Sequence, residues 1–246
     1  MIVPGASSYL AVNTNNMLPS VKLIVFDVAG TTLADHQEVH HCLQKALARA
    51  DVSISYEEAN RVMGYPKPRA IRLLLQGHWE DHSVITSERI EVIHDDFVLS
   101  MVEHYQNAPD VRPKEGVLET WQALRSAGVI IALDTGFSRP IADAIIERLH
   151  WQDYINTSVT SDEVKQGRPH PDMIFTAMER TGVGDVSEVA KVGDTASDMQ
   201  QGTAAGCGWV VGVTTGAYSA ADLEKEPHTH LIEQLPELLP ILGLSV

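Results

Sequence analysis

The chain has 246 residues, of which 44% are hydrophobic and 21% are charged, so it has enough apolar side chains to bury a globular core. Its 18 basic and 33 acidic residues give a formal net charge of −15. This charge argues against nucleic acid or an anionic membrane as a partner, because both would repel the protein. An anionic substrate would need a local group of cations to hold it.

The first 19 residues are predicted to form an N-terminal arm. The segment 1–19 has no basic start and no long apolar stretch, which is unlike a secretory signal peptide. Cys42 and Cys207 lie far apart and are expected to be reduced thiols. No apolar run approaches the roughly 18 residues that a membrane span needs. The sequence therefore favours a cytoplasmic protein.

One strand and then a helical segment follow the arm. Val21–Phe26 is a short apolar run of the kind that forms a buried strand. Residues 35–112 show almost no strand pattern, and a proline-rich and charged stretch, APDVRPKEG (108–116), looks like a linker back to the sheet. We therefore predict an all-helical cap at 35–112. Its predicted helices are Glu38–Ala50, Tyr56–Met63, Arg69–Gln76 and Ser87–Gln106.

Strands and helices alternate in the rest of the chain, which is typical of right-handed crossovers in a parallel sheet. We predict an α/β fold with a doubly wound, mainly parallel, Rossmann-like sheet, formed by residues 20–34 and 113–246. The predicted strands are Val129–Leu133, Ser158–Thr160, Val189–Val192, Trp209–Val213 and His230–Ile232. The predicted helices are Val117–Ser126, Arg139–Leu149, Pro171–Thr181 and Ala196–Ala205.

Polar residues follow several predicted strands at the point where each strand ends. Asp27 follows the first strand, DTGFSR (134–139) follows the second, and GDTASD (193–198) follows a later one. In open parallel sheets, ligands bind at the carboxyl ends of the strands. The active site is therefore expected at this edge.

Four short motifs carry a family resemblance. FDVAGTT (26–32), LDTGFSR (133–139), GRPHP (167–171) and VGDTASDM (192–199) resemble, in this order and spacing, the motifs of the haloacid dehalogenase superfamily of phosphoryl-transfer enzymes. Within that superfamily, Ala29, Arg168 in the third motif and MGYPK (63–67) resemble the phosphonoacetaldehyde hydrolases, or phosphonatases. The resemblance implies the same sheet and cap that the periodicity predicts.

The resemblance also implies a role for each motif residue. Asp27 would attack phosphorus and form an acyl phosphate. Mg²⁺ would be held by Asp27, the backbone carbonyl of Ala29 and Asp194, because Mg²⁺ prefers oxygen ligands. Asp198 would bind the metal through water or orient a neighbouring side chain. Contacts to the substrate are implied for Thr31, Met63, Gly64, Thr135, Gly136 and Arg168.

Most of these residues have a structural alternative as well. Asp27 could cap a helix or form a turn, and Asp198 suits the start of a helix because of the helix dipole. Thr135 could cap the helix predicted at Arg139–Leu149. Arg168 could be a surface arginine. The presence of all four motifs favours the catalytic interpretation.

Ala29 stands where many members of the superfamily have a second aspartate, which protonates the leaving group. Loss of such an acid typically costs about 10²–10⁴ in rate. A lysine that forms an imine with an aldehyde removes this need, because the carbon then departs as an enamine. Lys67 is the candidate by resemblance. Pro66 and Pro68 flank it, so an exposed loop lysine is the alternative.

Three functions are open at this point. The leading one is a Mg²⁺-dependent hydrolase that cleaves the C–P bond of a small carbonyl phosphonate through a Lys67 imine and a phosphorylated Asp27. The family has a histidine where this chain has Ala70, so the substrate could differ from phosphonoacetaldehyde. The others are a phosphomonoester phosphatase acting on a small metabolite and a catalytically weak protein that binds phosphorylated ligands. The resemblance also implies a homodimer.

Overall fold

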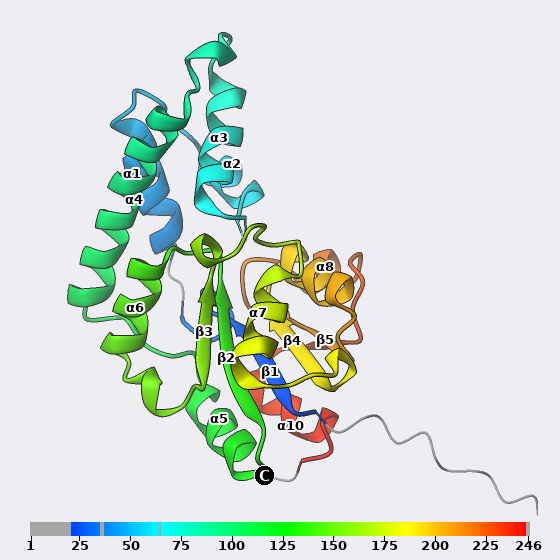
Figure 1. Cartoon of the computed structure of the whole chain (residues 1–246). Helices are drawn as coiled ribbons and strands as arrows, with labels where there is room; N and C mark the ends of the chain where they lie inside the picture. The colour runs from blue at the N-terminus through cyan, green and yellow to red at the C-terminus, as the bar shows by residue number, and fades with distance from the viewer. Residues whose placement is uncertain (1–20, 35–36, 64, 245–246) are drawn as a thin grey trace, which may run out of the picture.

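A parallel sheet forms the centre of the molecule. The computed structural model describes residues 21–34, 37–63 and 65–244. The predicted arm at 1–19 and Gly64, which is predicted to bind substrate, lie outside these residues. Within these residues the sheet has six strands in the order β3-β2-β1-β4-β5-β6, and all neighbouring strands are parallel (Figure 1). The strands are β1 (Leu23–Asp27), β2 (Ile130–Thr135), β3 (Thr157–Thr160), β4 (Val189–Gly193), β5 (Trp209–Val213) and β6 (His230–Ile232).

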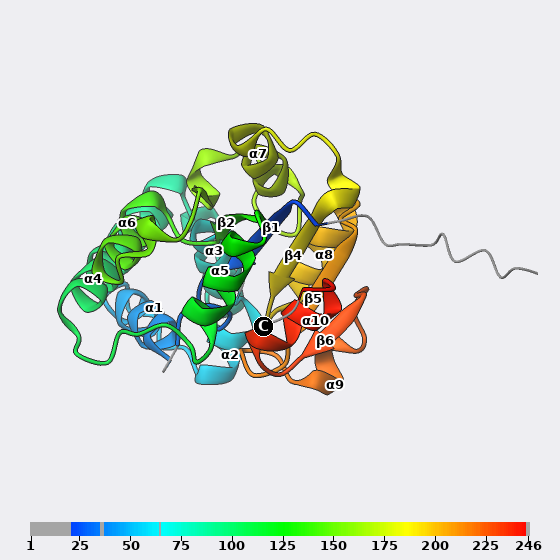
Figure 2. The ribbon, with the colours of Figure 1, turned by 90° about the horizontal axis from the view of Figure 1, so that it is seen from below.

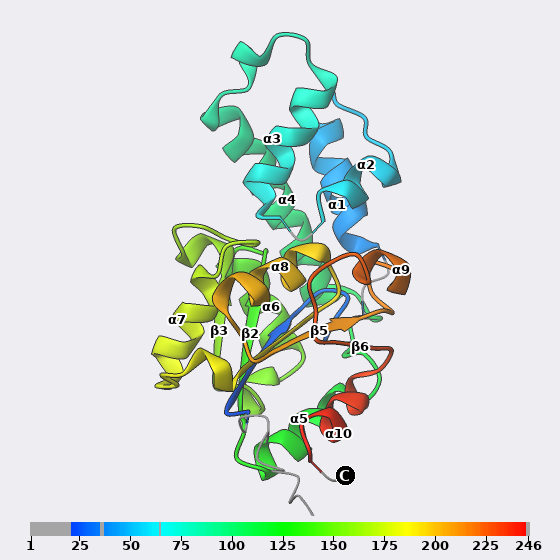
Figure 3. The ribbon, with the colours of Figure 1, turned by 90° about the vertical axis from the view of Figure 1, so that its right-hand side faces the viewer.

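A group of helices stands above the carboxyl ends of the strands. These helices lie between β1 and β2 in the chain, and they project away from the sheet in two perpendicular views (Figures 1 and 3). The predicted α/β fold with an inserted helical cap is confirmed. The cap helices are α1 (Glu38–Ala48), α2 (Tyr56–Arg61), α3 (Lys67–His78) and α4 (Ser87–Asn107).

The remaining helices cover both faces of the sheet, with α7 and α8 on one face and α5 and α10 on the other (Figure 2). Alternate residues of β1 therefore enter two different cores: Leu23 and Val25 pack with α7, whereas Ile24 and Phe26 pack on the opposite side. Burial on both faces explains why the strands have continuous apolar runs. These helices are α5 (Val117–Ser126), α6 (Arg139–Arg148), α7 (Asp172–Thr181), α8 (Ala196–Ala205), α9 (Ala220–Leu223) and α10 (Leu238–Ile241).

The bounds of two elements differ from the prediction in ways that affect the site. The strand β1 includes Asp27 itself, so this carboxylate sits on the sheet edge. The helix α3 begins at Lys67 and not at Arg69. Pro68 is accepted there because the first turn of a helix needs no backbone donor from it. None of the described helices is long and apolar enough to span a membrane.

Candidate active site

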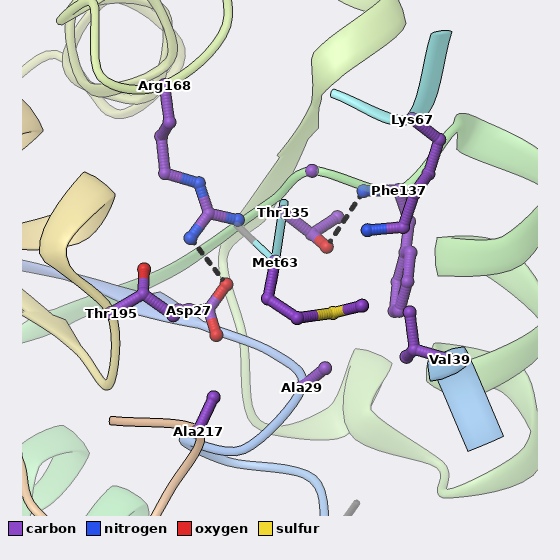
Figure 4. Close-up of a pocket in the computed structure, with 11 residues that line it drawn as sticks. Asp27, Ala29, Val39, Met63, Lys67, Thr135, Phe137, Arg168, Thr195 and Ala217 are labelled. Atoms are coloured by element: carbon purple, nitrogen blue, oxygen red, sulfur yellow. Dashed lines mark hydrogen bonds and ion pairs between the residues drawn. The ribbon is translucent and has the colours of Figure 1, made fainter. Parts of the chain in front are cut away.

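A small cavity of about 40 Å³ lies where the strands end and the cap meets the sheet (Figure 4). It brings together residues from β1, β2, the loop before α7 and the cap. Seven of the predicted site residues line it: Asp27, Ala29, Met63, Lys67, Thr135, Gly136 and Arg168. The other lining residues are Val39, Phe137, Thr195 and Ala217.

Asp194 lies beside this cavity and is held in a fixed position. The Thr31 hydroxyl donates to its Oδ1 over 3.0 Å, and the Ala217 amide donates to its Oδ2 over 2.6 Å. Thr31 therefore contacts this carboxylate and does not line the cavity. A Cβ at Gly30 or Gly216 would clash with Asp194, so both positions must be glycine for the loops to close on it. Burial, then repulsion from Asp198, raises the pKa of Asp194 to about 6.

Asp198 accepts hydrogen bonds or ion pairs at both of its oxygens. Its Oδ1 contacts Arg168 Nη1 and, at 3.0 Å, Lys191 Nζ. Its Oδ2 accepts from the hydroxyl and the backbone N–H of Thr195, which form a capping box at the start of α8. Burial alone would raise the pKa of Asp198, but Arg168 and Lys191 outweigh it and lower the pKa to about 2. Asp198 therefore orients these two cations.

Asp27 is the second carboxylate that pairs with Arg168. Its Oδ1 lies 2.8 Å from Nη1, the same nitrogen that contacts Asp198. Burial raises the pKa of Asp27 to about 8; Arg168 lowers it, but Asp198 and Asp194 add to the rise. Arg168 is 2% exposed, which excludes the alternative of a surface arginine. Its second terminal nitrogen is turned toward the cavity (Figure 4).

The residues fit a divalent cation. Oxygens of three buried carboxylates, Asp27, Asp194 and Asp198, lie within 4.8 Å of one another. With Asp134, these carboxylates outnumber the two buried cations that contact them, Arg168 and Lys191. A hard ion such as Mg²⁺ would neutralise this excess of negative charge.

Metal binding is expected to release protons. Metal ligands must be deprotonated. In the metal-free protein, the pKa values of about 8 for Asp27 and about 6 for Asp194 leave the site partly protonated at neutral pH. We expect the affinity for Mn²⁺ to rise by up to about tenfold per pH unit between roughly pH 6 and 8. Calorimetric titration in two buffers of different ionisation enthalpy measures the released protons; equal heats and a flat affinity would contradict this expectation.

Thr135, Gly136 and Phe137 form the turn after β2. The Phe137 amide donates to Thr135 Oγ1 over 3.1 Å, which fixes the hydroxyl at the floor of the cavity (Figure 4). The cap residue of α6 is Ser138 and not Thr135, so the structural alternative for Thr135 is wrong. Its hydroxyl hydrogen remains available to a ligand oxygen.

Lys67 brings its amine to the cavity from the cap. The side chain is only 4% exposed, and Nζ lies 5.6 Å from the ring centre of Phe137 and 5.9 Å from that of Phe97. Figure 4 shows the amine directed to the inside of the cavity, across from Asp27. The alternative of an exposed loop lysine is therefore wrong. Ala70, one turn further along α3, is fully buried.

Cap and core touch closely beside these two functional side chains. Pro66 immediately precedes Lys67, and Gly167 immediately precedes Arg168. A Cβ built on Gly167 would lie 2.6 Å from Pro66 Cγ, closer than real side chains pack. The absence of a side chain at Gly167 lets the cap approach the loop that carries Arg168.

Two residues of the site were missed by the sequence interpretation. Lys191 of β4 and Asp134 of β2 are fully buried and form an ion pair below the cavity. A signal was present: each is a charged residue inside or at the end of an apolar strand, where a solvated position is not available. The strand register that brings them together across β1 is not visible in one sequence.

The comparison with known families gives the class of this protein. The chain belongs to the haloacid dehalogenase-like hydrolases, whose family model matches residues 21–206. It is therefore an enzyme of the hydrolase class. Among similar proteins is the phosphonoacetaldehyde hydrolase of Bacillus cytotoxicus, which is 30% identical over 239 residues; the match covers 90% of this chain and 86% of the relative.

Solved structures confirm the fold. A phosphonoacetaldehyde hydrolase-like protein from Oleispira antarctica matches with a TM-score of 0.76 and 18% identity, over 92% of each chain. A predicted phosphoglycolate phosphatase from Haemophilus somnus matches with a TM-score of 0.73 and 22% identity, over 90% of this chain and 97% of the other. At these identities the likeness extends to the fold alone.

Proposed function

We propose that this hydrolase cleaves the C–P bond of a small carbonyl phosphonate, and that phosphonoacetaldehyde is converted to acetaldehyde and phosphate. The observation that carries the proposal is the position of the Lys67 amine. It enters the same cavity as the Asp27 carboxylate, from the opposite wall, and position 29 is alanine; among the residues that the structure describes, no acid other than Asp27 lines this cavity.

Lys67 makes the missing acid unnecessary. Its amine adds to the substrate aldehyde and loses water, which gives a protonated imine. Asp27 then attacks phosphorus, the C–P bond breaks, and its electron pair enters the imine to form an enamine. Protonation of the enamine carbon and hydrolysis of the new imine release acetaldehyde and restore Lys67. A second water hydrolyses the acyl phosphate and restores Asp27.

The other residues hold the phosphoryl group. Arg168 has a terminal nitrogen turned to the cavity, and the Thr135 hydroxyl lies on its floor, so both are placed to donate to phosphoryl oxygens. Mg²⁺, bound by Asp27, the Ala29 carbonyl and Asp194, would neutralise charge on the carboxylates and on the phosphoryl group. Met63 and, by resemblance, Gly64 would border the carbonyl part of the substrate.

The size of the cavity supports a small substrate. Its volume of about 40 Å³ compares with the roughly 10–15 Å³ that one water needs, so it has room for a group of only a few atoms. Opening of the cap would admit the substrate, and its return would exclude bulk water. A bulky phosphate ester would keep the cap from returning to this position.

The proposal includes the arrangement around the site. Residues 20–34 and 113–246 would form the catalytic core, and residues 35–112 would form the mobile cap. The resemblance further implies a cytoplasmic homodimer.

Reductive trapping tests the proposal. Borohydride added during turnover of phosphonoacetaldehyde should reduce the imine to a stable secondary amine and inactivate the enzyme. Peptide mass analysis should then find the added mass of an ethyl group on Lys67. Acetaldehyde and phosphate are measured together, with and without Mg²⁺. Full activity after borohydride treatment, with no modified Lys67, would rule out the imine route.

A further inference from the structure

The buried residue Lys191 has no part in the proposed reaction steps, yet it lies directly below the cavity in which they would occur. Its side chain is completely buried, at the centre of β4, and contacts Asp134 and Asp198. A buried ammonium group carries a large desolvation cost unless it is paired. A hydrophobic residue would fill this strand position more simply, so the lysine calls for a functional explanation.

The surrounding fold is shaped to admit this lysine and its partner. Gly202 of α8 packs over the lysine stem, and a Cβ there would lie 2.9 Å from Lys191 Cβ. A Cβ at Gly193 would clash with the Asp198 carboxylate. Gly202 thus leaves space for the side chain of Lys191, and Gly193 leaves space for that of Asp198.

Lys191 and Arg168 share one oxygen of Asp198. Both cations contact Asp198 Oδ1, while Arg168 Nη1 also contacts Asp27 Oδ1. Lys191 therefore supplies part of the positive charge that Asp198 requires. Without it, Asp198 would draw Arg168 more strongly toward the interior and away from the cavity.

We propose that Lys191 is a positioning residue: by holding Asp198, it leaves Arg168 directed to the phosphoryl group. Asp134 serves to neutralise the remaining charge of Lys191. This positioning role deepens the proposed function. It rests on that function only for the identity of the substrate, because the role applies to any phosphoryl group bound at this site.

Phosphate and metal affinities test the proposal without reference to turnover. Two separate calorimetric titrations are made with the full-length protein and its variants. In one, inorganic phosphate is added in the presence of saturating Mg²⁺; in the other, Mn²⁺ is added alone. In Lys191→Met we expect phosphate affinity to fall about tenfold, as for loss of a charged hydrogen bond. Mn²⁺ affinity should stay equal or increase, because the site has lost a positive charge. Lys165→Met, which removes an exposed lysine, is the matched control.

A double variant separates positioning from net charge and protects the fold. Lys191→Met alone leaves Asp134 unpaired, which is destabilising, whereas Lys191→Met with Asp134→Asn leaves no unpaired charge at that position. The double variant has the original net charge, but it lacks the contact between residue 191 and Asp198. Its phosphate affinity should therefore remain about tenfold reduced, while its Mn²⁺ affinity should equal that of the unmodified protein.

Three results would overturn the proposal. One is unchanged phosphate affinity in Lys191→Met, and another is its full recovery in the double variant. The third is a parallel loss of phosphate and Mn²⁺ affinity, which would indicate collapse of the site. If phosphonoacetaldehyde is not cleaved but phosphate binding depends on Lys191 as expected, only the proposed substrate is wrong.

Discussion

Replacing Lys67 with arginine should reduce C–P cleavage by at least about 10³-fold, because a guanidinium group cannot form an imine and no other described residue that lines the cavity carries an amine. The affinity for inorganic phosphate should change much less, since Arg168, Thr135 and Asp27 stay in place. The measurement is the single-turnover rate of acetaldehyde and phosphate release from phosphonoacetaldehyde, with phosphate affinity measured separately.

Two further variants make this result interpretable. Lys67→Met keeps most of the length of the buried side chain without an amine and should be as inactive as Lys67→Arg. Lys45→Arg makes the same change at an exposed lysine of α1 and should be fully active. Robust hydrolysis of a small phosphate ester that survives Lys67→Arg would instead support the phosphomonoester phosphatase. Mg²⁺ binding without phosphate release from any phosphonate or ester would indicate a binding protein.

Asp27→Asn should remove turnover more completely, by about 10⁴-fold or more, because the amide cannot accept the phosphoryl group. Both C–P cleavage and any ester hydrolysis should be lost, in contrast to the Lys67 variants. Rapid quenching and mass analysis should find a phosphorylated Asp27 in the unmodified protein and none in the variant. Substantial turnover by Asp27→Asn would exclude Asp27 as the nucleophile.

The stability of this variant provides an independent check. The raised pKa of Asp27, about 8, means that the folded protein disfavours its ionised form, so this contribution to stability is lost as the pH rises from the ordinary range of an aspartate up to about 8. In metal-free buffer near pH 9, Asp27→Asn should therefore unfold at a temperature no lower than that of the unmodified protein. Asp51→Asn is a control at an exposed residue whose backbone already has the left-handed conformation that Asn accepts.

The sheet and the cap could be predicted because their signals are local. Buried strands such as Trp209–Val213 read as continuous apolar runs, and helices such as Val117–Ser126 were bounded correctly. The four motifs predicted a site with Asp27, Thr135, Arg168 and Asp194 by resemblance, and the structure brings these residues together near the carboxyl ends of the strands.

The environment of each side chain could not be read in the same way. The pattern at Lys67 suggested an exposed turn, because two prolines flank it, and only the packing of α3 against Phe97 and Phe137 explains its burial. Lys191 was overlooked because its partners, Asp134 and Asp198, come from a different strand and a helix. Such contacts depend on register and on helix placement, which a single sequence does not specify.

The close approach of Pro66 and Gly167 has a consequence for how this enzyme can diverge. Because the two residues meet without clearance, a methyl group at 167 would act as a spacer under the cap and hold the amine of Lys67 away from the Asp27 carboxylate. All the reactive groups would still be present, but they would not assemble. Positions 66 and 167 are therefore not free to change independently, although neither takes part in the reaction.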